Sequence, residues 1–212
     1  MIVANRMTKN PVYVHPDMPV SEARSLMDKE KIGRLPVLDK NNVLVGIATK
    51  KDMLKAGPSA ATSLDMYEIS YLLSKLKIEK VMTKNVITVD ENEVIEEAAR
   101  IMSDNDISSL PVMRDKHLVG IITGKDLFKA FVNSFGARHK GVRLTFSMEE
   151  KPGQFAKLSR ALAEKDGNLV AFVSQEGDDL TKRSGTVKIT GLDKETVTQI
   201  AMQCGADIID IR

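Results

Sequence analysis

The sequence predicts an α+β protein that combines an internally repeated pair of small domains with a ferredoxin-like domain. Three short motifs recur in the same order within residues 1–133, which indicates two copies of one folding unit. Residues 141–212 instead show strand, helix, strand, strand, helix and strand patterns in succession, which is the βαββαβ order. These two observations predict the fold class.

Three motifs carry the internal repeat. The paired segments are residues 7–10 and 82–85, 32–37 and 107–112, and 44–52 and 118–126. Their spacing is kept, apart from one residue lost in the loop after Asp115. We therefore predict repeats over residues 1–56 and 78–133, joined by a linker over residues 57–77.

Each repeat is expected to follow the same order of elements. In the first, an extended segment leads into a helix whose apolar residues recur at helical spacing from Val20. Two strands, 35–38 and 43–48, then enclose a turn, and a second helix starts near Thr49. The extended segments are residues 12–14 and 86–89. Because such small sheets bury only one face, the two copies should pack face to face.

The linker is predicted to hold a loop and an amphipathic helix. The loop covers residues 57–63, and the helix covers residues 64–76. Its apolar face is formed by Ile69, Leu72, Leu73 and Leu76. We expect this face to pack against the repeats or against a second subunit, and a ligand-gated lid is the alternative.

Composition and charge argue against several classes of partner. Lysine and arginine number 31 against 29 acidic residues, so the net charge of +2 creates no field suited to nucleic acid or an anionic membrane. No apolar run reaches the roughly 18–20 residues that span a bilayer, and no signal peptide is recognisable. The single cysteine, Cys204, fits a reducing compartment. We expect a cytoplasmic protein.

No motif points to catalysis or to a metal. The histidines His15, His117 and His139 are scattered, and Cys204 has no evident base and reads as a small buried side chain. No P-loop, G-x-S-x-G or G-x-G-x-x-G pattern occurs. The sequence therefore predicts neither an enzyme, nor a metal site, nor a cofactor.

The most informative segments are 49–52 and 123–126, each Thr-x-x-Asp at a strand-to-helix junction. One interpretation is a capping box, in which the hydroxyl and the carboxylate satisfy backbone N–H groups. The other is a ligand site: the start of a helix attracts phosphate, the Asp accepts hydrogen bonds from a ribose, and the Thr and Lys face the anion. Arg34 could clamp a phosphate, and Val12 and Ile87 could enclose a base.

These motifs resemble those of a tandem CBS-domain pair, a Bateman module, over residues 1–133. The resemblance implies adenosine-containing ligands in clefts between the repeats, with the sugar-binding acid at Asp52 and Asp126 and the hydroxyl at Thr49 and Thr123. It implies further contacts at Thr8, Asn10, Val12, Arg34, Leu35, Pro36, Lys51, Thr83, Asn85, Ile87, Ser109, Leu110, Pro111 and Lys125. Since Ser109 stands where the first repeat has Arg34, we expect one cleft with a charged phosphate clamp and another without one.

The C-terminal elements are expected at defined positions. Strands are predicted at 142–146, 169–174, 185–190 and 206–211. A helix through Leu158 should end at Asp166-Gly167 with the glycine as its cap, and a second helix should cover 194–203.

With Pro152-Gly153 before the first helix and Gly167-Asn168 after it, residues 141–212 resemble an ACT domain. This resemblance implies dimerisation and a possible amino-acid site at Gly153, Gln154, Phe155 and Asn168. The order of CBS pair and ACT domain is similar to that of the AcuB-like acetoin-utilisation proteins.

Three functions are compatible with these features. The first is a homodimeric regulator whose CBS pair senses AMP, ADP, ATP or a related adenosyl ligand. The second is a scaffold that dimerises without a ligand. The third is an amino-acid sensor that acts through the ACT interface.

Overall fold

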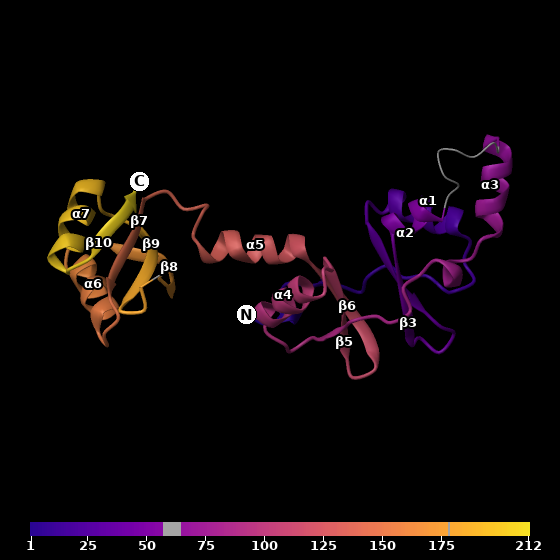
Figure 1. The fold of residues 1–212 in the computed structure, drawn as a ribbon, viewed down its shortest axis with the longest axis horizontal. Helices are drawn as coiled ribbons and strands as arrows, with labels where there is room; N and C mark the ends of the chain where they lie inside the picture. The colour runs from indigo at the N-terminus through magenta and orange to yellow at the C-terminus, as the bar shows by residue number, and fades with distance from the viewer. Residues whose placement is uncertain (57–64, 178) are drawn as a thin grey trace. The chain divides into compact units, whose positions relative to one another are not determined.

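The computed structural model describes residues 1–56, 65–177 and 179–212 (Figure 1). The chain divides into two compact units, Met1–Leu127 and Phe128–Arg212. The first unit holds both repeats up to Leu127 in α5 (Gly124–Ser134), and the second holds the rest of that helix and the ferredoxin-like sheet. The predicted loop at 57–63 and the start of the linker helix at Leu64 lie outside the described residues.

The first repeat has the predicted helices and the two predicted strands after Arg34, and it also has a 3-10 turn and a short strand before residue 12 that were not predicted. They are η1 (Val3–Asn5), β1 (Thr8–Lys9), α1 (Val20–Lys29), β2 (Arg34–Leu38), β3 (Leu44–Thr49) and α2 (Lys50–Lys55). The linker helix is α3 (Met66–Lys75), which lies against α1. The side chains of Ile69, Leu72 and Leu73 are outside the described part, so the predicted apolar face of this helix stays a prediction.

The second repeat follows the same order. Its elements are η2 (Ile78–Lys80), β4 (Val89–Asp90), α4 (Ile95–Asp104), β5 (Ser109–Arg114), β6 (His117–Thr123) and α5 (Gly124–Ser134). The helical spacing that predicted α1 and α4 corresponds to their buried faces, which include Ala23 and Met27 in one and Ala98 and Met102 in the other. The amphipathic pattern therefore places the two helices over equivalent cores.

The repeats exchange their leading segments. Thr8 of β1 pairs with Ile121 of β6 in the second repeat, and Thr83 forms an isolated bridge with Ile47 of β3 in the first. The Ile47–Thr83 bridge has two backbone hydrogen bonds, of 3.0 and 2.9 Å. Each repeat therefore supplies the opening segment that lies beside the last strand of the other.

The Met of one motif packs on the Gly of another across this exchange. A Cβ atom at Gly46 would lie 2.4 Å from Met82 Sδ, and a Cβ atom at Gly120 would lie 2.2 Å from Met7 Sδ. A side chain at either glycine would force the methionine to shift. The recurring Met-Thr-Lys-Asn and Gly-containing motifs are thus two halves of one contact between repeats.

The extended segments form less sheet than the sequence predicts. In the first repeat only Val14 bridges to a strand, at Val37, and in the second β4 covers only Val89–Asp90. The remaining residues of both segments pair with no strand among the residues that the structure describes. As a result Val12 and Ile87, at equivalent positions, stay exposed at 37% and 39%.

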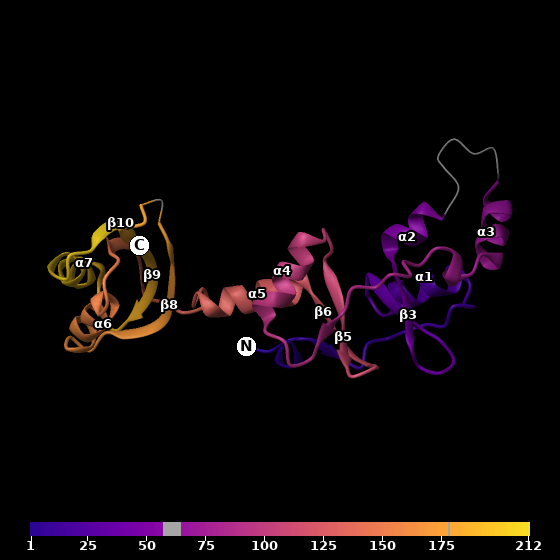
Figure 2. The same ribbon diagram turned by 60° about the horizontal axis from the view of Figure 1, so that its bottom comes forward.

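The second unit confirms the predicted βαββαβ order. Its elements are β7 (Val142–Glu149), α6 (Gln154–Ala163), β8 (Asn168–Glu176), β9 (Lys182–Thr190), α7 (Lys194–Gln203) and β10 (Asp207–Ile211). The strands form one antiparallel sheet in the order β10-β7-β9-β8. Both helices lie on one face of this sheet (Figure 2) and bury a core that includes Phe146, Leu162 and Cys204.

The predicted end of α6 is wrong by a few residues. The helix ends at Ala163, and Asp166, not Gly167, takes the left-handed conformation, with φ 62°. Gly167 is required for another reason: a Cβ atom there would lie 2.5 Å from Leu192 Cδ1 and 2.9 Å from the carbonyl oxygen of Leu162. Close packing between the helix end and the next loop, rather than a positive φ, explains this glycine.

Candidate ligand-binding site

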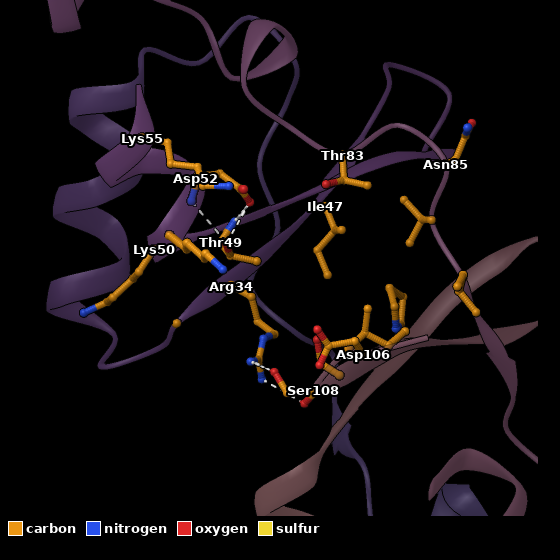
Figure 3. Close-up of a pocket in the computed structure, with 17 residues that line it drawn as sticks. Arg34, Ile47, Thr49, Lys50, Asp52, Lys55, Thr83, Asn85, Asp106 and Ser108 are labelled. Atoms are coloured by element: carbon orange, nitrogen blue, oxygen red, sulfur yellow. Dashed lines mark hydrogen bonds between the residues drawn. The ribbon is translucent and has the colours of Figure 1, made fainter. Parts of the chain in front are cut away.

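The first unit contains a cavity of about 590 Å³ between the two repeats. This volume lies within the range of small-molecule sites. Its lining residues come from β2, β3 and α2 of the first repeat and from the leading segment and the α4–β5 turn of the second (Figure 3). They are Gly33, Arg34, Ile47, Thr49, Lys50, Lys51, Asp52, Lys55, Thr83, Asn85, Val86, Ile87, Asp106, Ile107, Ser108, Ser109 and Pro111.

Thr49 and Asp52 form a complete capping box at the start of α2. Asp52 Oδ2 accepts from the Thr49 amide at 2.8 Å and from the Thr49 hydroxyl at 2.7 Å, and the Asp52 amide donates to that hydroxyl at 3.3 Å. Asp52 Oδ1 accepts no hydrogen bond from any residue that the structure describes. The same carboxylate can therefore cap the helix through one oxygen and accept a ligand hydroxyl through the other.

Arg34 reaches across the boundary between the repeats. Its guanidinium donates from Nη2 to Ser108 Oγ at 2.8 Å and from Nη1 to the Ser108 carbonyl oxygen at 3.4 Å (Figure 3). Its Nε is buried and has no hydrogen-bond partner among the described residues, and burial lowers the pKa of this guanidinium below its ordinary value. An arginine stays protonated at neutral pH, so Arg34 brings a positive charge to the wall of the cavity.

The three lysines of α2 differ in what they can offer. Lys50 Nζ forms an ion pair with Asp28 at 2.6 Å, and its side chain points away from Arg34 (Figure 3). Within the described residues, Lys51 and Lys55 have no ion-pair partner. They are therefore the lysines available to a ligand.

The facing wall is apolar and comes from the second repeat. Ile87 and Val86 follow the Thr83 bridge, and Ile47 lies on β3 beside that bridge. Because Ile87 has no strand partner, its exposed side chain offers an apolar surface to a flat ligand. Asn85 lies at the rim with its amide pointing outward (Figure 3).

Many of the residues proposed from the sequence line this one cavity: Arg34, Thr49, Lys51, Asp52, Thr83, Asn85, Ile87, Ser109 and Pro111. Leu35 and Leu110 do not, because both are fully buried in the cores of their own repeats, and Pro36 is buried as well. The exchange of leading segments explains why Asp52 meets Thr83 and Ile87 rather than Thr8 and Val12.

The remaining predicted residues surround an equivalent arrangement in the second repeat. There Thr123 donates to Asp126 Oδ2 from its amide at 3.1 Å and from its hydroxyl at 2.7 Å, as in the first repeat. β1 carries Thr8 beside β6, and the Asn10 amide donates to the Val119 carbonyl oxygen at 3.2 Å. Val12 lies exposed two residues farther on, and Lys125 is exposed at the start of α5.

The expected division of Arg34 and Ser109 between two clefts is wrong. Both residues line the same cavity, because the first residues of β2 and β5 meet where the repeats face each other. The sequence interpretation also omitted Lys55, Asp106 and Ser108. Their signal was local: Asp106 and Ser108 lie four and two residues before Leu110 of the Leu-Pro-Val strand, and Lys55 lies one helical turn after Lys51.

The ferredoxin-like unit has a smaller cavity, of about 320 Å³, beside the start of α6. Gly153, Gln154 and Phe155 line it as proposed, together with Glu150 and Arg183, which form an ion pair. Asn168 does not line it. Asn168 pairs with Thr190 at one end of β9, whereas Arg183 lies near the other end.

Two kinds of site are not found in the part of the chain that the structure describes. No three or more His, Cys, Asp and Glu side chains gather where they could ligate a metal ion. No helix there is both long enough and apolar enough to cross a bilayer.

Curated relatives resemble the N-terminal part of the chain. An L-aspartate semialdehyde sulfurtransferase of Methanocaldococcus jannaschii is 34% identical over 131 residues, which is 61% of this chain and 23% of the relative. An inosine-5′-monophosphate dehydrogenase of the same organism is 32% identical over 165 residues, 77% of this chain and 30% of the enzyme. The chain thus spans less than a third of the length of either enzyme.

Solved structures share the fold of this region. The CBS domain pair of protein MJ0100, in complex with 5′-methylthioadenosine and S-adenosyl-L-methionine, is 32% identical and covers 66% of this chain and 98% of its own, with a TM-score of 0.53. A Vibrio cholerae protein assigned as AcuB, for acetoin utilization, is 27% identical with the same coverage and a TM-score of 0.54. CBSX2 in complex with AMP is 31% identical over 62% of this chain and 96% of its own, with a TM-score of 0.51.

The pattern of one family matches both repeats and thereby more than half of the chain. Its description is CBS domain, and the matched residues are 3–59 and 78–133. The exchanged leading segments, the capped α2 and the cavity between the repeats all lie within or between these two matches. The chain therefore belongs to the CBS-domain family, of which it carries a tandem pair.

Proposed function

We propose that this protein is a regulator whose CBS pair binds an adenosyl ligand in the cavity between the repeats. Two structural relatives support the ligand class, since one holds 5′-methylthioadenosine and S-adenosyl-L-methionine and the other holds AMP. These ligands share adenine and ribose and differ in what is attached to the ribose 5′ carbon. The cavity offers a matching surface for each of these parts.

One observation carries the proposal: a carboxylate with an unused oxygen, an exposed apolar wall and an unsatisfied guanidinium line the same cavity. Asp52 Oδ1 would accept from the ribose hydroxyls, and Ile87 would lie against the adenine. Arg34 would contact the group attached at the 5′ carbon. The Thr49 hydroxyl already donates to Asp52, so it is left as an acceptor, and an anionic group would depend on Arg34 with Lys51 and Lys55.

Titration calorimetry of the full chain with adenosine, AMP, 5′-methylthioadenosine and S-adenosyl-L-methionine tests this proposal. Asp52→Ala should weaken the binding of every ligand by about 1.5–3 kcal/mol, because all of them share the ribose. The same variant should lower the free energy of unfolding by about 0.5–2 kcal/mol, because the helix cap is lost. Asp193→Ala removes a capping carboxylate of α7 in the other unit and should cost stability alone. Equal affinity in the wild type and Asp52→Ala would reject the site.

A second binding position is proposed around Thr123, Asp126 and the β1 segment. There Thr123 donates to the Asp126 carboxylate from its amide and its hydroxyl, as Thr49 does to Asp52. Exposed Val12 corresponds to Ile87. A stoichiometry of two per chain, reduced to one by Asp126→Ala, would support it, and a stoichiometry of one that Asp126→Ala leaves unchanged would reject it.

We also propose that the regulator is a homodimer. Leu54 on α2 and Phe128 on α5 occupy equivalent positions and are exposed at 68% and 73%, and Phe131 next to Phe128 is exposed as well. Apolar side chains repeated on equivalent helices suit a closed two-fold contact. Sedimentation showing a monomer at micromolar concentration would contradict the dimer.

Amino-acid sensing by the C-terminal unit is the second candidate function. Its supporting observation is the cavity lined by Gly153, Gln154 and Phe155 beside the Glu150–Arg183 pair, together with the resemblance to ACT domains. Thermal melting against single amino acids tests it, since a ligand of the folded state raises the melting temperature. If neither amino acids nor adenosyl compounds shift the melting temperature, the ligand-free scaffold is the function that remains.

A further inference from the structure

A cationic and an anionic side chain line the cavity near Ser108 (Figure 3). Arg34 donates to Ser108, and Asp106 stands two residues before Ser108 in the turn between α4 and β5. Arg34 and Asp106 both line the cavity, yet they form no ion pair with each other. No hydrogen bond or ion pair joins the Asp106 carboxylate to any described residue, and the Arg34 Nε has no partner either.

This pair of charges disfavours a simple phosphate. A phosphate near Arg34 would also approach the Asp106 carboxylate, and two anions repel each other. A group that carries an ammonium and a carboxylate on one carbon instead satisfies both residues, because its carboxylate can bind the guanidinium while its ammonium binds the aspartate. The α-amino-acid group has this arrangement of charges.

The equivalent residue of the first repeat shows that Asp106 is not required by the fold. Lys31 has φ 53° and Asp106 has φ 51°, and the residues that follow them make the same backbone bond, Ile32 to Met27 and Ile107 to Met102, both at 2.9 Å. The turn thus accepts a cation in one repeat and an anion in the other. The backbone of the turn therefore does not require the negative charge of Asp106.

We infer that Asp106 and Arg34 together select an adenosyl ligand whose 5′ substituent carries an α-amino-acid group. This inference rests on the proposed function, because it assumes that the ribose lies at Asp52. It names Asp106 as the residue that distinguishes this class from nucleoside monophosphates. Arg34 alone would favour both classes, since each has an anionic group.

Calorimetry of the full chain and its Asp106→Asn variant, at low and at physiological salt, provides the test. The probes are S-adenosyl-L-methionine, with an α-amino-acid group, AMP, with a phosphate, and 5′-methylthioadenosine, with an uncharged substituent. The variant should bind S-adenosyl-L-methionine about two- to fivefold more weakly and AMP about two- to fivefold more tightly, with 5′-methylthioadenosine unchanged. These shifts should shrink as salt is raised.

The matched control is Asp115→Asn. Asp115 also has a positive φ, 53°, and is exposed in the same repeat, but it does not line the cavity. Asparagine tolerates this backbone conformation, so both variants should fold. The control should leave all three affinities unchanged.

Opposite shifts for S-adenosyl-L-methionine and AMP support the inference. Shifts in the same direction, or no shift in either, overturn it while the proposed function stands. If the wild type binds none of the three probes, the proposed function falls, and this inference falls with it.

Discussion

The two repeats place nearly the same backbone around different chemistry. In both, the residue after the Thr of Thr-x-x-Asp donates its amide to the residue before the Leu-Pro-Val strand, Lys50 to Gly33 at 2.9 Å and Gly124 to Ser108 at 3.1 Å. Both Thr–Asp pairs bond in the same way. The neighbouring positions nevertheless differ in charge, with Arg34 in the first repeat against Ser109 in the second.

This difference separates what the fold needs from what a ligand needs. The apolar helix faces, the Thr–Asp caps and the Met-on-Gly contacts occur twice because each repeat needs them to fold and to meet its partner. The charged positions face solvent or a cavity, so they can diverge without disturbing the core. The pair is symmetric as a scaffold and asymmetric as a binding surface.

The largest expected effect comes from removing the guanidinium of Arg34. Arg34→Gln should weaken the binding of AMP and of S-adenosyl-L-methionine by about 1.5–3 kcal/mol, because a charge-assisted hydrogen bond to the anionic group of each ligand is lost. Binding of 5′-methylthioadenosine should change little. Calorimetry measures this, with Arg24→Gln as a charge-matched control outside the cavity. An equal loss for all three ligands would show that Arg34 shapes the cavity rather than binding the 5′ substituent.

The two Met-on-Gly contacts, which occupy equivalent positions in the repeats, can be tested by their effect on stability. Gly120→Ala should cost about 1–3 kcal/mol of stability, because its new methyl meets Met7 and also lies 3.1 Å from the carbonyl oxygen of Thr8. Gly46→Ala should cost less, since only the flexible Met82 must move.

Gly33→Ala is the control for this pair, because no atom lies within 4 Å of a Cβ at that position. It should stay within about 0.5 kcal/mol of the wild type. Chemical denaturation measures the free energy of unfolding of the three variants and so ranks them. A Gly33→Ala variant as unstable as Gly120→Ala would show that backbone freedom, not the sulfur contact, explains these glycines.

The smallest expected effect concerns acid stability, where the repeats again differ. Glu91 of the second repeat accepts two hydrogen bonds from Arg114, one of them 2.9 Å long, and this contact lowers the pKa of Glu91 below its ordinary 4.5. The first repeat has Pro16 and Asp39 at these positions. Because the folded pKa is depressed, the stabilisation is present above pH 4.5 and is lost as the pH falls through the folded value.

Melting temperatures at pH 7 and in the acid range test this point. Glu91→Gln should melt lower than the wild type at pH 7, and the gap should narrow below pH 4.5. Glu96→Gln, an exposed glutamate on α4, serves as the control. A gap that stays constant with pH would mean that Glu91 acts through packing alone.

Much of the fold could be predicted because its signals are local. The bounds of α7, Lys194–Gln203, agree with the prediction, and the helices at Val20 and Ile95 begin where their apolar spacing begins. Caps and periodic apolar positions act over one or two turns, so they are legible in a single sequence. At Asp52 the capping interpretation is confirmed, whereas the ligand interpretation stays a prediction that its place in the cavity supports.

The less accurate predictions concern long-range pairing. Leu35 and Leu110 belong to the motifs but are fully buried, because strand alternation and packing decide which side of a motif faces the cavity. Ser108 lies inside the repeated segment 107–112 and Asp106 directly before it, yet nothing local shows that they line the cavity beside Arg34. Their importance depends on a residue that is more than seventy positions away in the chain.

The sequence by itself determined that the chain repeats, which helices and strands each copy forms, and that Thr49 and Asp52 stand together. These properties follow from interactions within a few residues. Only the tertiary structure decided that the repeats exchange their leading segments, which places Thr83 and Ile87 opposite Asp52 and brings Arg34 to Ser108. The physical reason is that several strand pairings would bury similar apolar surface, and the packing of Met82 on Gly46 and of Met7 on Gly120 favours one of them.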